Sequence, residues 1–519
     1  MSKQPFQIAI VGSGFAGSLM AMVAQRLGFS TVLIERGRHP RFAIGESSTP
    51  LANLLLEEIA VAYDLPCVRP LCKWGTWQKQ LPQLACGLKR GFTFYHHAFG
   101  KPFATNANRV NQLLVGASPN EDIADTHWYR PDFDHYLVQQ AEKLGVIFLD
   151  ETVLRNARAE TTGMRLSGNR RSEPIEITAD FVIDATGPRG FLHQALGLPE
   201  KSLAGLPSTQ GLFAHFKNVG ALPGNFSTPR QTPPYPAEQA AVHHVFPGGW
   251  IWVLKFNNGI TSAGVAATDV LANELELNSG APAWRRLLDR LPSVAEIFQS
   301  AQVTMPFVHS PRLAFQSGVV TGARWALLPS AAGFIDPLLS TGFPLTLLGV
   351  QRMGAVLKLG WQDSSLQRRL DDYAELTGLE LETASRLVGA LYATMGHFDL
   401  FKELSLLYFA AASYSETVRR LGKPELAAGF LLCRQPELAT HFRQICAAAS
   451  HAHSAAAVRE LCQTIRNAIE PFDVAGLTDP ARHPWYPALP SDLLRQAWKV
   501  GASEPEIRMM LHRCGLDPA

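Results

Sequence analysis

The first 35 residues constrain the fold of this 519-residue chain more than any other segment. Phe6–Val11 is an apolar run of strand length, and the turn GSGFAG follows it directly. Ser18–Gly28 then has the composition of a helix, and Ser30–Glu35 is predicted as a second strand. Strand, glycine turn, helix and strand in this order form one βαβ unit. The chain is therefore predicted to contain an α/β body.

The glycine turn has the spacing of a dinucleotide-binding site. Gly12, Gly14 and Gly17 form the pattern GxGxxG, in which glycine lets the backbone approach a pyrophosphate at a helix N-terminus. Glu35 ends the second strand, where a carboxylate can bind the ribose of an adenosine. The alternative is a glycine-rich turn without a ligand. The full context favours a site made by Gly12, Gly14, Ala16, Gly17 and Glu35.

Later segments extend this pattern over the rest of the chain. Four runs rich in apolar, β-branched or aromatic residues are predicted as strands: Gly91–His97, Val146–Leu149, Phe181–Gly187 and Trp250–Phe256. From about Leu366 the composition changes to Ala, Leu, Arg and Glu with helical periodicity. We expect residues 1–365 to form the α/β body with an interlaced β-sheet region, and residues 366–519 to form a helical C-terminal region.

Three further segments indicate which dinucleotide is bound. Only one GxGxxG pattern is present, so a second domain of this kind for a nicotinamide cofactor is not expected. Arg130 in RPDFDHYL, Asp184 and Gly187 in VIDATG, and Asp336 with Pro337 in GFIDPL are similar in order and spacing to the FAD-contacting segments of the flavin monooxygenase superfamily typified by p-hydroxybenzoate hydroxylase. The resemblance implies a Rossmann-type FAD-binding body and FAD as the cofactor.

Two motifs resemble the catalytic loop and lysine of the flavin-dependent halogenases. GESSTP at Gly45–Pro50 is similar to the strap loop that runs beside the flavin in that family. The resemblance implies that Gly45, Glu46 and Ser47 contact the cofactor. ACGLKRGFTF places Lys89 at the position of the family's essential lysine. Without the resemblance, a lysine beside an arginine would be interpreted as a solvated pair.

Two more motifs strengthen the same resemblance. GGWIWVLKF aligns Trp250 and Trp252 with the tryptophans of the family sequence WxWxIP. LLSTGF puts Ser340, Thr341 and Gly342 where the family binds its halide, largely through backbone N–H groups. The four motifs, in order along the chain, imply an FAD-dependent halogenase. The two tryptophans alternate on one strand, so both face the same side and can also serve as core packing.

One position points to the phenol-halogenating branch of this family. Tryptophan halogenases carry a glutamate immediately before the serine of the last motif, whereas this chain has Leu339. A phenolic oxygen donates electron density to its ring, so its ortho and para carbons attack an electrophilic halogen without a held general base. The expected substrate region includes Phe94, Trp250 and Trp252, together with the helical C-terminal region.

The resemblance also implies a reaction and its partners. FADH2 from a separate flavin reductase would react with dioxygen and oxidise chloride or bromide to hypohalous acid. Lys89 would relay this oxidant, by hydrogen bonding as an ammonium or as a haloamine, to an electron-rich aromatic that is free or tethered to a carrier protein. That role requires burial, which eases loss of the lysine proton and keeps water from the oxidant.

Two other functions remain open at this stage. An aromatic hydroxylase of the same fold would transfer oxygen rather than halogen. A flavoprotein that does not halogenate is suggested by Leu254-Lys255 in place of Ile-Pro and by Pro329-Ser330 in place of Gly-Asp. Glu46 has a second interpretation as well, because an acceptor in front of a helix near Thr49 is a candidate cap.

Composition bears on partners and location. The formal net charge is +2, and 18% of residues are charged, which argues against a nucleic-acid partner. No apolar run approaches the roughly 18 residues of a membrane span, so no membrane association is expected. Seven scattered cysteines without metal-ligand spacing predict reduced thiols, no metal site and a cytoplasmic protein.

Overall fold

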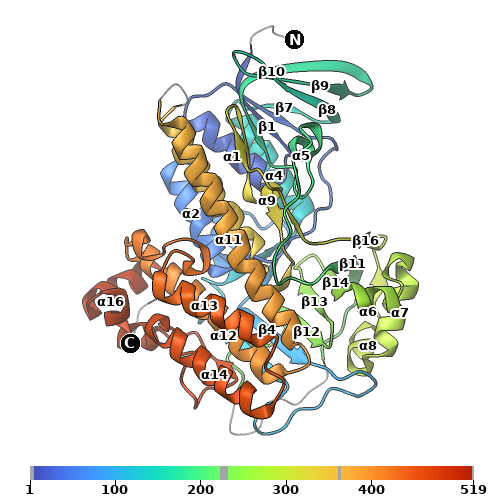
Figure 1. Ribbon diagram of the computed structural model, residues 1–519, viewed down its shortest axis with the longest axis vertical. Helices are drawn as coiled ribbons and strands as arrows, with labels where there is room; N and C mark the ends of the chain where they lie inside the picture. The colour runs from blue at the N-terminus through green and yellow to red at the C-terminus, as the bar shows by residue number, and fades with distance from the viewer. Residues whose placement is uncertain (1–4, 223–231, 361–363, 517–519) are drawn as a thin grey trace.

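A computed structural model describes residues 5–222, 232–360 and 364–516 of the chain (Figure 1). One sheet has the strand order β18-β19-β10-β1-β2-β7, with a ribbon of β8 and β9 attached to β10. Its pairs β10–β1, β1–β2, β2–β7 and β10–β19 are parallel. The strands are β1 (Phe6–Val11), β2 (Thr31–Ile34), β7 (Ile147–Leu149), β8 (Thr152–Ala159), β9 (Met164–Arg170), β10 (Glu173–Asp184), β18 (Thr321–Gly322) and β19 (Trp325–Leu327).

The predicted βαβ unit is confirmed. Helix α1 (Phe15–Arg26) connects β1 to β2, and Phe15–Ala24 is buried throughout. Helix α1 is buried on all sides because it also packs against α4 (Arg130–Lys143) and α10 (Gly342–Lys358). A helix enclosed in this way must be apolar on every face.

A second sheet lies below the first in Figure 1 and has nine strands. Its order is β15-β11-β14-β13-β12-β4-β5-β21, with β16 beside β11, and most pairs are antiparallel. The strands predicted around Gly91–His97 and Trp250–Phe256 are β4 and β13. The members are β4 (Gly91–His96), β5 (Gln112–Gly116), β11 (Thr209–Lys217), β12 (Ala241–Phe246), β13 (Gly249–Lys255), β14 (Thr261–Thr268), β15 (Gln302–Val303), β16 (Val308–Ser310) and β21 (Trp485–Tyr486).

Short elements connect the two sheets and cover their edges. Strands β3 and β6 form a small antiparallel pair, as do β17 and β20. These elements are α2 (Pro50–Ala62), α3 (Trp74–Gln80), β3 (Cys86–Lys89), β6 (Asp125–Trp128), α5 (Phe191–Ala195), α6 (Asp269–Glu274), α7 (Ala281–Asp289), α8 (Pro292–Phe298), β17 (Phe315–Gln316), α9 (Pro329–Ala332) and β20 (Gly333–Phe334).

The C-terminal region is mainly helical, in agreement with its periodicity. Helix α11 runs from the side of the first sheet to the second and packs on α10 and α12 (Figure 1). The short β21 is the exception, because it adds to β5 at the edge of the second sheet. The division at residue 365 stays a prediction. The helices are α11 (Leu366–Thr394), α12 (Phe398–Arg420), α13 (Pro436–Ala449), α14 (Ala455–Ile469), α15 (Pro490–Arg495) and α16 (Glu504–Arg513).

Three sequence expectations concern features of the whole chain. Within the described residues, none of the helices combines the length and apolar character that crossing a membrane requires. All seven cysteines are free thiols, as predicted. The same described ranges contain no group of three or more His, Cys, Asp or Glu side chains arranged to hold a metal ion.

Candidate active site

The glycine turn after β1 leaves a cradle that side chains would fill. Gly12 has φ +97°, and a Cβ there would lie 2.7 Å from the Ala185 carbonyl oxygen. A Cβ on Gly17 would lie 1.8 Å from the Gly12 carbonyl oxygen. Both positions therefore require glycine. The turn leads into α1 with Gly14 as the cap residue, so N–H groups at the helix N-terminus are available to an anion.

Glu35 stands at the end of β2 and organises this turn. Its Oε2 accepts hydrogen bonds from Ser13 N (3.1 Å), Ser13 Oγ (2.9 Å) and Arg41 Nη2 (3.0 Å), and Oε1 accepts from Gly37 N (2.9 Å). Burial by itself raises the pKa of Glu35, but the Arg41 charge and these hydrogen bonds outweigh it and lower the pKa. Glu35 is therefore a fixed carboxylate at the adenosine end of the predicted dinucleotide site.

Arg130 joins the first turn of α4 to the strap loop. Its Nε and Nη2 donate to the two carboxylate oxygens of Asp134 at 2.8 and 2.7 Å. Its Nη1 donates to the carbonyl oxygens of Ile44 (3.0 Å) and Gly45 (2.8 Å). The same guanidinium lies beside the glycine turn, 3.4 Å from where a Cβ on Gly14 would be. One buried arginine thus ties the strap to the candidate cofactor site.

The strap runs along the edge of β6. Trp128 N donates to the Glu46 carbonyl oxygen at 2.6 Å, and Ser48 N donates to the Thr126 carbonyl oxygen at 3.2 Å. The interpretation of Glu46 as a helix cap is wrong, because the Thr49 hydroxyl caps α2.

The Glu46 side chain points elsewhere. Its Oε1 lies 2.9 Å from Nε2 of His215, while Oε2 is buried without a hydrogen-bond partner among the described residues. A buried polar atom of this kind ordinarily has a partner, so Oε2 is an acceptor available to a bound group.

Asp184 binds groups of its own chain. Its Oδ1 accepts from Thr186 N (2.8 Å) and Thr186 Oγ1 (2.5 Å), and Oδ2 accepts from Leu192 N (2.6 Å). Burial raises the pKa of Asp184 despite these bonds. The carboxyl group therefore fixes the turn that contains Gly187, which has φ +88°. The expected cofactor contact of Asp184 and Gly187 stays a prediction.

Asp336 connects three distant segments. Its Oδ1 accepts from Trp250 Nε1 (3.2 Å) and Leu338 N (2.9 Å), and Oδ2 accepts from Tyr392 Oη (2.9 Å). Burial raises the pKa of Asp336 to about 6. These bonds link β13, the turn after Pro337 and α11. Trp250 therefore has a polar partner in addition to its packing.

The predicted halide turn leads into α10. Leu339 (φ 61°) and Ser340 (φ 55°) are both left-handed, which is uncommon for residues other than glycine. Thr341 is buried, and a Cβ added to Gly342 would meet no atom within 4 Å. The space beside Gly342 at the start of α10 is therefore open, and an anion near a helix N-terminus needs such space.

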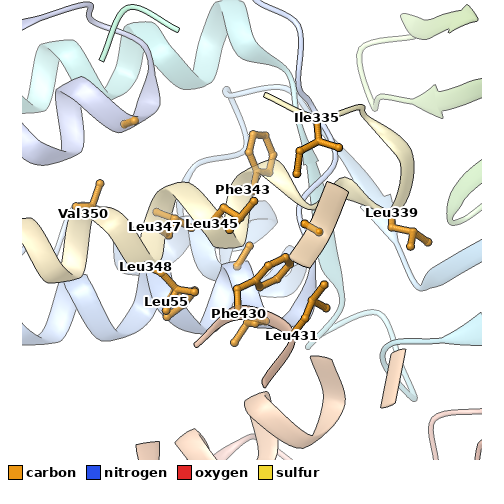
Figure 2. Close-up of a cluster of buried hydrophobic side chains, with 14 of the residues drawn as sticks. Leu55, Ile335, Leu339, Phe343, Leu345, Leu347, Leu348, Val350, Phe430 and Leu431 are labelled. Carbon is orange, nitrogen blue, oxygen red and sulfur yellow. The ribbon is translucent and has the colours of Figure 1, made fainter. Parts of the chain in front are cut away.

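Apolar packing holds α10 in place. Figure 2 shows Phe343, Leu345 and Leu348 of this helix with Leu55 of α2 and Phe430 in one buried cluster. The cluster anchors the start of α10, and the halide turn is attached to it.

Lys89 is fully buried, as its expected role requires. Its Nζ donates to Ser47 Oγ (2.8 Å) and to the Ser48 carbonyl oxygen (2.5 Å), so the side chain reaches from β3 to the strap. The ammonium also lies 3.7 Å above the Phe92 ring. Burial lowers the pKa of Lys89, and the charge of Asp125, its cross-strand neighbour on β6, opposes this.

A cavity of about 200 Å³ lies next to this lysine. Phe92 forms part of its wall, so the ring stacked under the lysine also faces the cavity. The wall combines the end of the strap, β4, β6, α12 and C-terminal segments. Its members include Thr49, Pro50, Asn53, Phe92, Asp125, Tyr408, Phe409, Glu416, Arg420, Leu477, Tyr486, Leu489, Leu511 and Leu516.

The three aromatic residues predicted for the substrate region are core residues. The Phe94 ring stacks on His243 with centroids 4.4 Å apart, and Trp252 Nε1 donates to Ser262 Oγ at 3.3 Å. None of the three, Phe94, Trp250 and Trp252, is among the described residues that line the cavity. Residues of the C-terminal region do line this cavity, and their expected contact with the substrate stays a prediction. Sequence reasoning missed Asp125, because nothing in its local sequence indicates that it faces Lys89.

Comparisons with known proteins identify the family. The profile described as tryptophan halogenase matches residues 104–400. Tetracycline 7-halogenase of Kitasatospora aureofaciens is 25% identical over 98% of this chain and 95% of its own length. Monodechloroaminopyrrolnitrin halogenase PrnC of Pseudomonas fluorescens is 28% identical over 78% of this chain and 70% of its own length.

Solved structures agree in fold. The crystal structure of halogenase PltM covers 93% of this chain and all of its own, with a TM-score of 0.81 and 24% identity. PltM in complex with phloroglucinol and FAD covers 91% of this chain and 98% of its own, with a TM-score of 0.77 and 23% identity. The fold is thus that of a flavin-dependent oxidoreductase. The chain belongs to the tryptophan halogenase family of flavin-dependent halogenases.

Proposed function

We propose that this enzyme uses FADH2, supplied by a separate flavin reductase, with dioxygen and chloride or bromide to halogenate an electron-rich aromatic through Lys89. The observation that carries the proposal is the bond from Lys89 Nζ to Ser47 Oγ. It connects a buried lysine, which lies over the Phe92 ring of an aromatic-lined cavity, to the loop that is expected to contact the flavin. One side chain therefore bridges the two places where oxidant and ring would be.

The residues around the glycine turn fit FAD. Gly12 and Gly17 leave the cradle for a pyrophosphate, and α1 offers its N-terminus. Glu35 is a carboxylate at the ribose end, and Glu46 Oε2 is a buried acceptor without a partner in the described part of the chain. FAD, when bound and reduced, would supply the two electrons that activate dioxygen. Arg130 would then hold the strap against the cofactor.

The start of α10 fits a halide. Ser340, Thr341 and Gly342 form the turn, the helix N-terminus favours an anion, and the space beside Gly342 is open. These residues would hold chloride or bromide through backbone N–H groups, so the choice of halide would depend on the size of this space.

Lys89 would deliver the oxidant. As an ammonium it donates a hydrogen bond to hypohalous acid and polarises the O–halogen bond. Because burial lowers its pKa, the free amine is also accessible, and the amine can form a haloamine. Either form needs a site without bulk water, which would consume the oxidant. Complete burial of Lys89 meets this condition.

The cavity suits a small aromatic substrate. Phe92, Tyr408 and Phe409 supply ring surfaces, and aromatic rings favour offset or edge contacts with one another. The PltM complex with phloroglucinol supports a free phenol. A relative named as a chlorinase of a pyrrole on a peptidyl carrier protein supports the tethered alternative. Leu339, which replaces the glutamate of tryptophan halogenases, favours the phenol.

The test is a halogenation assay on a panel of phenols. Purified protein with a flavin reductase, NADH, oxygen and bromide should give a brominated resorcinol-type product, recognised by its isotope doublet in mass spectrometry. Products with added oxygen and no halogen would establish the hydroxylase alternative instead. Oxidation of reduced flavin without any aromatic product would establish the flavoprotein that does not halogenate.

Removal of the lysine tests its role directly. Lys89→Ala should lower the rate of bromination by about 100- to 1,000-fold, the usual effect of losing one donor to a developing charge. Oxidation of reduced flavin should continue. Lys79→Ala is the matched control, because this exposed lysine pairs with Asp122 at the surface. Wild-type bromination by the Lys89→Ala enzyme would show that the lysine relays nothing.

A further inference from the structure

Asp125 is a buried carboxyl group that the proposed reaction does not yet use. It lies at the start of β6 and lines the cavity, with 5% of its surface exposed. Asn53 Nδ2 donates to its Oδ1 at 2.9 Å. Its Oδ2 is buried and has no hydrogen-bond partner among the residues that the structure describes. A buried carboxylate oxygen is costly to leave unbonded, so it indicates a missing donor.

Glu416 and Arg420, two other charged groups in the cavity wall, already have partners. Arg420 Nε donates to Glu416 Oε1 at 2.8 Å, and Arg420 Nη1 lies 3.8 Å from Glu57 Oε2. Lys89 donates to the strap. Asp125 Oδ2 is therefore a buried acceptor that a ligand in this cavity can satisfy. Asn53 Oδ1 and Ser118 Oγ of the same wall also lack partners among the described residues, but only Asp125 among these three carries a carboxyl group.

The position of Asp125 relative to Lys89 indicates which part of a substrate this acceptor would bind. The two residues are directly paired across the antiparallel strands β3 and β6. Side chains at paired positions lie on the same face of such a ribbon. A ring that donates a hydroxyl hydrogen to Asp125 is thereby held on the side from which Lys89 presents the oxidant.

We propose that Asp125 Oδ2 accepts the hydroxyl hydrogen of a phenolic substrate and takes its proton as the ring is halogenated. This inference rests on the proposed function and specifies the substrate class as aromatics with a free hydroxyl group. It also assigns Asp125 the part of a catalytic base, supplied from β6 in a chain where Leu339 occupies the position of the tryptophan halogenases' glutamate.

The step balances with hypobromous acid as the oxidant. The phenolic O–H bond breaks, its proton goes to Asp125, and the electron pair stays on the ring system. An ortho or para carbon forms the C–Br bond while the Br–O bond breaks, and the leaving hydroxide takes a proton from the Lys89 ammonium to become water. The ring carbon then loses its proton to the Lys89 amine, and Asp125 returns its proton to the oxygen.

The protonation chemistry of the pair suits this exchange. Burial raises the pKa of Asp125, and the Lys89 charge opposes the rise. Burial lowers the pKa of Lys89, and Asp125 opposes the fall. The two groups therefore approach each other in proton affinity. Glu416 and Arg420 of α12 also act on Asp125, Glu416 raising and Arg420 lowering its pKa.

The experiment compares resorcinol with 1,3-dimethoxybenzene in the bromide assay. Both rings are electron-rich, but only resorcinol can donate a hydrogen bond or a proton. Asp125→Asn should lower resorcinol bromination by about 100-fold, within the usual range for loss of a general base. It should lower dimethoxybenzene bromination far less, because that ring would use Asp125 only through its effect on the pKa of Lys89. Asp125→Glu should restore part of the resorcinol rate. Asp122→Asn, at an exposed carboxylate, is the control.

The pH profile gives a readout that a purely structural role would not change. The wild-type resorcinol rate should fall in acid as Asp125 becomes protonated, and the Asp125→Asn rate should lack this limb. Equal losses on both rings, or an unchanged resorcinol rate, would overturn the inference. A wild-type enzyme that brominates neither ring would instead remove the proposed function on which it rests.

Since an inactive variant can also reflect misfolding, a binding measurement on the wild-type enzyme provides an independent test. Calorimetry should show that resorcinol binds at least tenfold more tightly than 1,3-dimethoxybenzene, since only resorcinol satisfies Asp125 Oδ2. Equal affinities would count against the hydrogen bond, whatever the variants do.

Discussion

The clamp formed by Arg130 offers a sharp test of how the strap is held. Arg130→Met removes a guanidinium that makes two bonds to Asp134 and two to the strap carbonyls of Ile44 and Gly45. The Asp134 side chain has no solvent exposure, so the variant leaves a buried carboxylate without its partner. Breaking one side of a buried pair typically costs about 3–5 kcal/mol.

A second variant separates the charge from the clamp. Arg130→Met with Asp134→Leu removes both charges, and such apolar replacements are often neutral or stabilising. Most of the lost stability should therefore return in the double variant. The strap carbonyls would still lack their donor, so flavin affinity should stay low in both.

The measurements are the free energy of unfolding in urea and the affinity for FAD from fluorescence quenching. Arg130→Met should lose about 3–5 kcal/mol, and the double variant should recover at least half of that. Equal stabilities for the two variants would refute the buried pair as the main contribution of Arg130. Wild-type FAD affinity in the double variant would refute the clamp on the strap.

Two further outcomes follow from single buried positions. Gly17→Ala should abolish measurable FAD binding, since its Cβ would overlap the Gly12 carbonyl oxygen. Gly378→Ala in α11 is the control: its added Cβ meets no atom within 4 Å, so this variant should bind FAD normally. Calorimetric titration distinguishes the two, and normal binding by Gly17→Ala would contradict the cradle. Asp336 has its pKa raised from 3.8 to about 6, so it stabilises the fold below pH 3.8 and loses that contribution as pH rises through 6. Wild type should therefore lose about 2 kcal/mol more than Asp336→Asn between pH 4 and 7 in unfolding experiments on the FAD-free protein; parallel curves would exclude this linkage.

The sequence pattern predicted the helices and strands whose formation depends on interactions between residues close in the chain. The βαβ unit around Gly12, strands β4 and β13 and the helical C-terminal region all follow from periodicity and glycine spacing. The N-cap of α2 is a case in which the sequence left the residue undetermined. Glu46 was a candidate, but the cap hydroxyl belongs to Thr49, because a cap residue immediately precedes the first helical residue, here Pro50.

Contacts between distant segments could not be predicted in this way. Asp125 faces Lys89 because β6 pairs with β3 in one particular register, which the sequence of either strand leaves undetermined. Trp250 contacts Asp336 for a similar reason, because the segment after β20 packs against β13. The roles of the motif residues in flavin, halide and substrate binding remain predictions that the variants above can test.

The cavity wall has a consequence for how such enzymes diversify. Many of its residues, from Leu477 to Leu516, come from segments beyond residue 400, where the match to the family profile ends. Strand β21 fastens one of these segments to β5, so the tail is part of the second sheet. Under the proposed function, part of the surface that contacts the ring is encoded far along the gene from the residues that would make the oxidant. Substitutions in the tail can therefore change which aromatic is halogenated while the residues that would make the oxidant stay the same.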